Sequence, residues 1–374
     1  MRKCIAFVKK ETVLSIALIL AVISSLIILP DAEYLDYIDF RTLGILFCLM
    51  AVMAGLRKIG VFGRIAGKLL EKVKSIRALV LILVLLCFFF SMVITNDVAL
   101  ITFVPFTFTV LRMTGEEQAK KLAVPVVAMQ TIAANLGSML MPIGNPQNLY
   151  LYGQAGMGLG EFVRLMLPYS VLSSVMLVVW CLFQKGGTVS VGAMAGNDSV
   201  CAHTKELMVY LLLFVCCLLT VARVVPYGIT MIVVIAAVLW VDRQVLAKVD
   251  YALLLTFVGF FVFIGNMGRI PAFSSFLENM IAGHEVITAV ISSQVISNVP
   301  AALLLSGFTN DYRALIVGTN LGGLGTLIAS MASLISFKYM GQVDKERKGA
   351  YMIYFTAANL IFLIVLIGYH FVAV

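Results

Sequence analysis

The sequence has few charged residues, few histidines and none of the common catalytic or nucleotide-binding motifs. Only 12% of its 374 residues are Asp, Glu, Lys or Arg, and three are His. It lacks a Gly-x-x-x-x-Gly-Lys-[Ser/Thr] loop, and its apolar segments hold neither His-Glu-x-x-His nor Gly-x-Ser-x-Gly. Its seven cysteines fall mostly in apolar segments without metal-ligand spacing. We therefore expect neither an enzyme nor a protein with a bound cofactor.

What the chain does contain is an unusual amount of apolar sequence. Hydrophobic types make up 61% of it, and the mean hydropathy is +1.04. A soluble domain of this length does not need so much apolar surface, so we predict an all-α protein that crosses the lipid bilayer several times. The net charge of +8 is spread over short loops between apolar runs. That distribution indicates membrane topology rather than binding to nucleic acid.

One apolar run, residues 78–111, predicts a re-entrant hairpin. It holds a single ionisable group, Asp97, near its middle. One helix of that length would be ~50 Å long, whereas the hydrocarbon core of a bilayer is ~30 Å thick and two full spans need roughly 40 residues. We therefore expect two short arms that meet at Thr95, Asn96 and Asp97 inside the membrane. A carboxylate at that depth must face protein or a watery cavity, which is typical of a binding site.

The next apolar segment, residues 122–152, predicts a discontinuous helix. Pro142, Gly144 and Pro146 stand within five residues of one another, and a regular helix cannot continue through them. Asn145 and Asn148 flank the break with neutral side chains that can bind a ligand. Such an opened helix leaves backbone carbonyls unpaired, which suits Na⁺.

The second half of the chain repeats both features. It predicts a second hairpin at 286–308 and a second discontinuous helix at 315–337. The matching motifs are Ile94-Thr95-Asn96 with Ile296-Ser297-Asn298, and Asn135-Leu136-Gly137 with Asn320-Leu321-Gly322. Paired interrupted segments at corresponding positions indicate the binding site of a transporter.

The domain prediction is two inverted-topology repeats, residues 1–184 and 205–374, joined by a cytoplasmic linker at 185–204. About nine spans result, with one extra span inverting the second repeat, the N-terminus in the cytoplasm and the C-terminus outside. Five arginines then lie outside and the other 22 basic residues inside, in agreement with the positive-inside rule. The five are Arg41, Arg164, Arg223, Arg269 and Arg313.

Asn96 and Asn298 each stand where a half-helix begins. Asn is a favoured N-cap, and Pro300 suits a first helical turn because its missing N–H would be unpaired anyway. Two helix N-termini, each with a partial positive charge, would point at the same region from opposite sides. They favour binding of an anion.

The motifs at these positions resemble those of a known group of membrane proteins. They are Ile-Thr-Asn-Asp-Val-Ala-Leu-Ile-Thr-Phe-Val-Pro at 94–105, Gly-Asn-Pro-Gln-Asn-Leu at 144–149 and Ser-Asn-Val-Pro-Ala-Ala at 297–302. They are similar to the citrate-permease-like branch of the ion transporter superfamily, which includes divalent anion/sodium symporters, arsenite permeases and one group of sodium/proton antiporters. The resemblance implies hairpin tips that contact substrate and sodium, a homodimer, and an elevator-like movement of the hairpin-bearing part.

These lines of reasoning give two sets of candidate residues. The expected substrate-binding residues are Thr95, Asn96, Asn145, Pro146, Asn148, Ser297, Asn298, Thr326 and Ser330. The expected ion-coupling residues, where Na⁺ can bind, are Asp97, Gly137, Ser138, Gly144, Val299, Gly322 and Gly323.

The function that we expect is secondary transport of a small anion, a carboxylate or an oxyanion, across the inner or plasma membrane. Coupling to Na⁺ or H⁺ would drive it, without any further cofactor. One alternative is a sodium/proton antiporter in which Asp97 is the exchanging group. Another is a membrane subunit that works with a separate ATPase, because the chain has no ATP-binding loop of its own.

Overall fold

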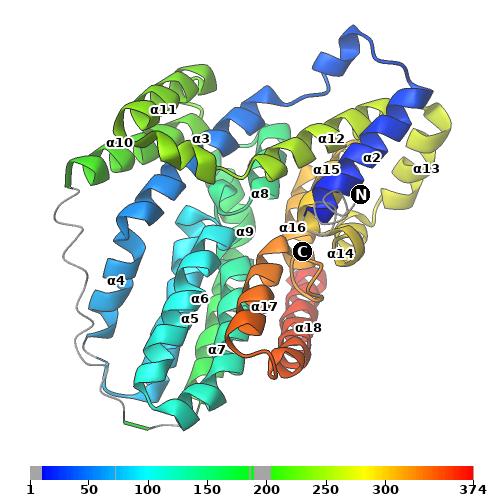
Figure 1. Ribbon diagram of the computed structural model, residues 1–374. Coiled ribbons are helices and arrows are strands. Elements are labelled where there is room, and N and C mark those ends of the chain that lie inside the picture. The colour runs from blue at the N-terminus through cyan, green and yellow to red at the C-terminus, as the bar shows by residue number, and fades with distance from the viewer. Residues whose placement is uncertain (1–10, 72, 185–186, 189–203, 374) are drawn as a thin grey trace.

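The computed structural model describes residues 11–71, 73–184, 187–188 and 204–373, and its regular elements are helices apart from one isolated bridge between Ser75 and Thr188 (Figure 1). Eight of these helices are long and apolar enough to cross a membrane. They include both arms of the first hairpin and omit three of the nine predicted spans, which are short or interrupted. The chain is therefore an all-α protein with several membrane-spanning helices, as predicted. The predicted linker at 185–204 lies almost entirely outside the described residues.

The helices follow one another in the same succession twice. The first part of the chain contains α2 (Thr12–Ile27), η1 (Ala32–Leu35), α3 (Phe40–Ile59), α4 (Val61–Leu70), α5 (Ile76–Ile94), α6 (Asn96–Met113), α7 (Glu116–Ser138), η2 (Pro142–Gly144), α8 (Pro146–Gln154) and α9 (Leu159–Leu182). The second part contains α10 (Thr204–Val221), α11 (Tyr227–Asp242), η4 (Arg243–Lys248), α12 (Tyr251–Gly268), α13 (Pro271–Ile281), α14 (Glu285–Ile296), α15 (Asn298–Ser306), α16 (Tyr312–Gly322), α17 (Met331–Val343) and α18 (Lys348–Ala373). In both, an apolar and an amphipathic helix precede a helical hairpin, a broken helix and a long final helix.

Both hairpins turn at a single residue with an unusual backbone. Thr95 joins α5 to α6 with φ 70° and ψ 149°, and Ser297 joins α14 to α15 with φ 74° and ψ 153°. A positive φ is rare for any residue other than glycine, and this region costs roughly 1–3 kcal/mol. Because the same strained conformation occurs at two matching positions, the sharp turn is common to both tips.

The arms of the first hairpin are longer than the sequence predicted. Helices α5 and α6 have 19 and 18 residues, against 12 and 9 for α14 and α15. Each arm of the first hairpin could therefore cross a membrane on length alone. The tip lies in the protein interior, because Asn96 is buried, as is Asn298 of the second tip, and the re-entrant path stays a prediction.

The two helix breaks are held open by different means. At the first, Pro142 and Pro146 stand at the starts of η2 and α8, where a missing N–H costs nothing. At the second, between α16 and α17, the amide of Gln294 bonds the backbone. Its Nε2 donates to the carbonyls of Gly322 and Leu324 at 3.0 and 2.8 Å, and its Oε1 accepts from the N–H of Thr326 at 2.9 Å.

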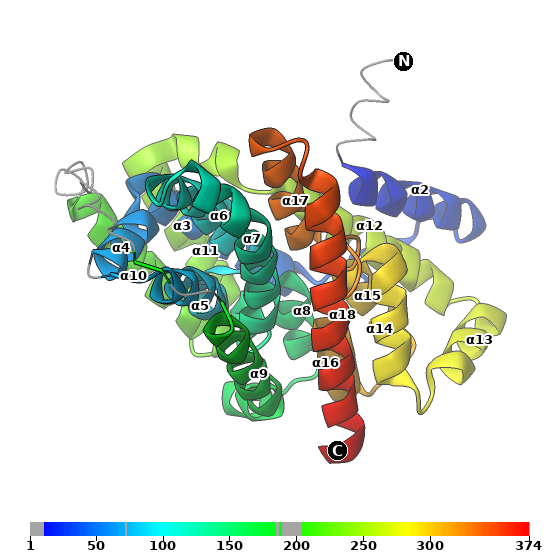
Figure 2. The ribbon, with the colours of Figure 1, turned by 90° about the horizontal axis from the view of Figure 1, so that it is seen from below.

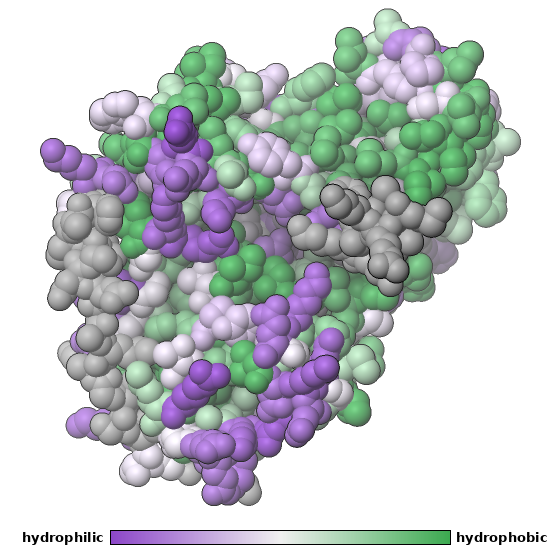
Figure 3. Space-filling view, in the orientation of Figure 1, coloured by the Kyte–Doolittle hydropathy of each residue, from purple (hydrophilic) through white to green (hydrophobic). Residues whose placement is uncertain are grey.

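The hairpins and broken helices form a core beside an outer set of helices. The outer set contains α2, which packs on α12, and α3, which packs on α10 and α11. In Figure 1 these helices occupy the upper part of the view, and α5, α6, α7 and α18 occupy the lower part. Figure 2 shows α5, α6 and α7 on one side and α14 and α15 on the other, with α8, α16 and α18 between them. Hydrophobic residues cover α2 and its neighbours in Figure 3, whereas hydrophilic residues gather over the middle and the lower part of that face.

Glycines let the hairpins pack closely on the broken helices. A Cβ on Gly137 in α7 would overlap the backbone carbonyl of Phe88 in α5. A Cβ on Gly322 in α16 would stand 2.7 Å from the Cβ of Ser293 in α14. The Asn-Leu-Gly motif therefore includes its glycine for packing in both halves.

We predict that Gly137→Ala lowers the thermal stability of the purified protein. The added methyl group meets backbone rather than a flexible side chain, so α5 and α7 must separate, and such overpacking costs roughly 1–3 kcal/mol. Gly67→Ala in α4 is the matched control, because its Cβ would meet open space and helix propensity should then stabilise by up to ~1 kcal/mol. Equal melting temperatures for the two variants in detergent would contradict the prediction.

Candidate functional site

The two hairpin tips and the two helix breaks meet at one small polar cavity. Its volume is about 20 Å³, which is room for about one water molecule. Its polar lining comes from both hairpins, both breaks and the first turn of the outer helix α12. These residues are Asn96, Asp97, Asn145, Gln147, Asp250, Asn298 and Ser330. No Lys or Arg of the described chain lines this small cavity.

The side chain of Asn135, near the end of α7, joins the first tip to the second break. Its Oδ1 accepts hydrogen bonds from Nδ2 of Asn96 and from Oγ of Ser330, both at 3.1 Å. Its Nδ2 donates to Oγ of Ser333 at 3.3 Å and makes a longer contact, 3.5 Å, with the carbonyl of Gly323. One amide therefore links α6, α7 and the segment that precedes α17.

A second set of amides surrounds the first break. Nδ2 of Asn145 donates to Oγ of Ser138 at 2.7 Å, and Nδ2 of Asn148 donates to the carbonyl of Ser138 at 3.3 Å. Nδ2 of Asn320 in α16 then donates to Oδ1 of Asn148 at 2.6 Å. Asn320 is the counterpart of Asn135, but its buried Oδ1 has no hydrogen-bond partner among the described residues.

The two helices that start at the cavity are capped differently. At α6, Oγ1 of Thr95 accepts from an N–H of the first turn at 3.4 Å, and Oδ1 of Asn96 accepts from the N–H of Asp97 at 2.9 Å. At α15 no side chain caps the helix. The N–H of Asn298 instead donates to the backbone carbonyl of Ala329 at 3.0 Å, and the partial positive charge of the α15 N-terminus faces the cavity without a side-chain cap. In α6 the position that corresponds to Val299 of α15 is occupied by Asp97, which carries a carboxylate.

Asp97 also lines a larger cavity that leads away from the small one. This second cavity has a volume of about 130 Å³ and shares four lining residues with the first: Asp97, Pro146, Asp250 and Leu253. Its lining also includes Arg57 at the end of α3 and Lys248 in η4. Oδ1 of Asp97 is buried and has no hydrogen-bond partner among the described residues. Both cavities therefore adjoin Asp97 and Asp250.

The structure brings most of the predicted residues to this region, in different roles. Thr95, Ser297 and Val299 belong to the tips, and Val299 lines the small cavity. Gly323 lies against the Asn298 side chain, since a Cβ there would stand 2.9 Å from Nδ2 of Asn298. Four further predicted residues support the breaks rather than line the cavity: Ser138, Asn148, Gly137 and Gly322.

Two predicted residues have other roles or positions. Thr326 is exposed and bonds to Gln294, outside the lining of the small cavity. Gly144 is a packing residue, since a Cβ there would overlap the carbonyl of Ser138.

Sequence reasoning missed Gln147 and Asp250. Gln147 is fully buried, and neither amide atom has a hydrogen-bond partner among the described residues. It stands inside the Gly-Asn-Pro-Gln-Asn-Leu motif, but the motif does not show that its amide is unpaired. Asp250 caps α12 by accepting from the N–H of Leu253 at 3.0 Å, as Asp39 caps α3 by accepting from the N–H of Thr42 at 2.9 Å. An Asp followed by an aromatic residue at both helix starts is the pattern that could have indicated it.

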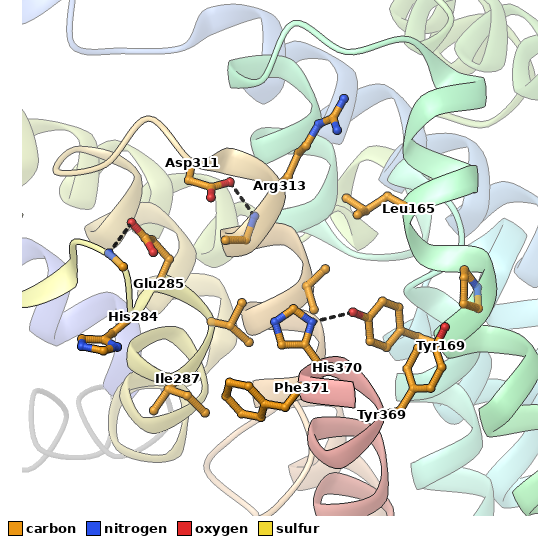
Figure 4. Close-up of a pocket in the computed structure, with 15 residues that line it drawn as sticks. Leu165, Tyr169, His284, Glu285, Ile287, Asp311, Arg313, Tyr369, His370 and Phe371 are labelled. Atoms are coloured by element: carbon orange, nitrogen blue, oxygen red, sulfur yellow. Dashed lines mark hydrogen bonds between the residues drawn. The ribbon is translucent and has the colours of Figure 1, made fainter. Parts of the chain in front are cut away.

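A third cavity, of about 480 Å³, lies between α9, α14, α16 and α18 (Figure 4). None of the predicted site residues lines it. In Figure 4 the side chains of Tyr169 and His370 point toward one another, and the Tyr169 hydroxyl lies 2.8 Å from Nδ1 of His370. This cavity is thus separate from the region where the tips and breaks meet.

Comparison with known proteins identifies the family of the chain. Residues 4–311 match the protein family described as "Citrate transporter". The chain is 33% identical to an uncharacterized transporter of Methanocaldococcus jannaschii over 91% of this chain and 92% of that protein. It is 30% identical to the inner membrane protein YbiR of Escherichia coli over 80% of each. Over 46% of this chain and 36% of the relative, it is 28% identical to the silicon efflux transporter LSI3 of Oryza sativa.

We predict that Gln147→Met raises the melting temperature of the ligand-free protein. A buried amide without partners costs about 1–3 kcal/mol, and Met has a similar shape without that penalty. Gln130→Met is the matched control. Gln130 is equally buried, but its Nε2 donates to the carbonyl of Leu83 at 2.9 Å and to Oγ1 of Thr107 at 2.8 Å, so its loss should lower the melting temperature. A similar fall for both variants would show that Gln147 is bonded in the protein.

Proposed function

Because the chain belongs to the citrate transporter family and is a membrane transporter, we propose that it moves a small anion by secondary active transport coupled to Na⁺ or H⁺. The observation that carries this proposal is the meeting of two hairpin tips and two helix breaks at one cavity, whose polar lining is four amides, the Ser330 hydroxyl and two carboxylates. Amides and an uncapped helix N-terminus bind carboxylates and oxyanions without a fixed positive charge. We place the anion beside α15, near Asn298, Ser330 and Gln147.

The names of the relatives support a small, oxygen-rich substrate. The family description names citrate, and the rice relative is named for silicon efflux. In the conformation described here the cavity has room for about one water molecule, so a carboxylate or oxyanion needs the tips and breaks to move apart. We propose that the hairpin-bearing core moves against the outer helices. We also propose that the protein is a homodimer, and its molar mass measured in detergent would test this assembly.

Asp97 is the residue that we propose couples the ion gradient to transport. Its unpaired, buried Oδ1 must be neutralised by a proton or a cation, since an ionised carboxylate without partners is costly to bury. The same observation favours a second candidate function, sodium/proton exchange at Asp97. The two candidates differ in whether an anion crosses the membrane with the ion.

We predict that Asn96→Ala and Asn298→Ala each abolish uptake into proteoliposomes. Both side chains line the cavity, whereas the loss of one side-chain hydrogen bond lowers the free energy of unfolding by only about 1 kcal/mol, so each variant should still fold. Asn310→Ala is the control, because Asn310 is exposed in the loop before α16 and lies outside the small cavity. Wild-type uptake by either tip variant would assign the tips a structural role only.

For Asp97→Asn we predict uncoupling. Counterflow exchange of substrate should persist, because the neutral amide fills the same volume without needing a cation. Gradient-driven accumulation, and its dependence on pH or Na⁺, should be lost. If accumulation kept its wild-type ion dependence, coupling would lie elsewhere, around the breaks near Gly137 and Gly322.

We propose the inner or plasma membrane as the location, with the N-terminus in the cytoplasm and the C-terminus outside. In a Cys-free background, Lys345→Cys in the exposed turn between α17 and α18 should then react only from the cytoplasm. Gly156→Cys, in the exposed turn after α8, should react with an impermeant maleimide from outside. Labelling of position 345 from outside would show that the second repeat has the opposite orientation to the one proposed.

A further inference from the structure

We propose that Asp97 and Asp250 together form a binding site for one monovalent cation that bridges the first hairpin and the outer helix α12. The proposal rests on the proposed function only in treating Asp97 as an ion-coupling residue. It adds a ligand from outside the hairpins and the broken helices. The site would therefore be complete only when the two parts of the molecule lie against each other.

The charges around the small cavity favour a cation. Asp97 and Asp250 are its only charged lining residues among those described. Arg57 and Lys248 line the larger cavity but not the small one. The small cavity therefore holds two carboxylates without a counter-charge, which repel one another until a cation or a proton lies between them.

A second, independent observation indicates that something binds here. Gln147 is fully buried, lines the same cavity, and has no hydrogen-bond partner for either amide atom among the described residues. A native protein rarely leaves a buried amide unpaired, so its Oε1 is available as a neutral ligand beside the two carboxylates. The volume of about 20 Å³ fits one ion or one water molecule and excludes a carboxylate substrate.

The position of each carboxylate gives the cation a path. Asp250 is exposed at the junction of the two cavities, whereas Asp97 is partly buried with one oxygen out of reach of water. A cation from solvent would meet Asp250 first and then reach Asp97. Oxygen ligands from carboxylates and amides suit Na⁺, and the same pair of carboxylates can share a proton, so the experiment must separate the two.

The test measures thermal unfolding of the purified full-length protein in detergent, with no substrate present. Na⁺ is titrated against choline at constant ionic strength at alkaline pH, and pH is titrated in the absence of Na⁺. We expect the melting temperature of the wild type to rise by roughly 2–4 °C in one of the two titrations, which identifies the cation. Asp250→Asn and Asp97→Asn should each abolish that rise, and the double variant should behave like the single ones.

Asp39→Asn is the matched control. Asp39 caps α3 in the same way as Asp250 caps α12, but it does not line the cavity, so this variant should keep the wild-type rise. Asn caps a helix as well as Asp does, so the helix caps are kept in Asp39→Asn, Asp97→Asn and Asp250→Asn. Asp250→Ser is a further variant that keeps a capping side chain and removes the charge. A full wild-type rise in both Asp250 variants would overturn the bridging site, as would a wild type that responds to neither cation. Because no substrate is present, either outcome leaves anion transport to be judged by the uptake experiments.

Discussion

The protein depends on satisfying backbone and amide groups where helices start and stop inside an apolar interior. Each tip and each break leaves N–H or C=O groups that water cannot reach, and such groups are costly in a membrane. Gln294 bonds three backbone groups of the second break, and Asn135 connects the first tip to the segment before α17. Because one amide serves elements from both parts of the chain, the first tip and the second break are fixed relative to each other.

The sequence predicted the parts of this arrangement that have local causes. Two prolines forced the break near Pro142, and the repeated Thr-Asn and Ser-Asn steps located the turns at Thr95 and Ser297, within one residue of where the helices meet. Gln147 and Asp250 escaped prediction for a different reason. The importance of each comes from its surroundings in space, since an unpaired amide, or a carboxylate that lines the same cavity as a second carboxylate, is a property of the packed protein and not of its neighbours in the chain.

The two halves share a backbone design but differ in charge. Thr95 and Ser297 have nearly the same strained conformation, and each begins a helix that points at the cavity. The next position but one is Asp97 in the first half and Val299 in the second. We propose that the carboxylate at one helix start and the helix N-terminus without a side-chain cap at the other give this cavity a side that suits a cation and a side that suits an anion. The two halves thus have similar backbones at the cavity, and the difference between Asp97 and Val299 would let each half bind a different ion.

A cation can control movement only if its affinity differs between conformations. Asp97 belongs to the first hairpin and Asp250 to the start of α12 in the outer set of helices, so a displacement that moves the hairpin away from α12 would separate the two proposed ligands. Separation weakens the site, and the bound cation therefore favours the conformation described here. Linkage is reciprocal, so a movement that pulls the pair apart also promotes release of the cation. The location of two acidic residues on opposite sides of one interface is thereby enough to connect ion binding with the movement that a transporter needs.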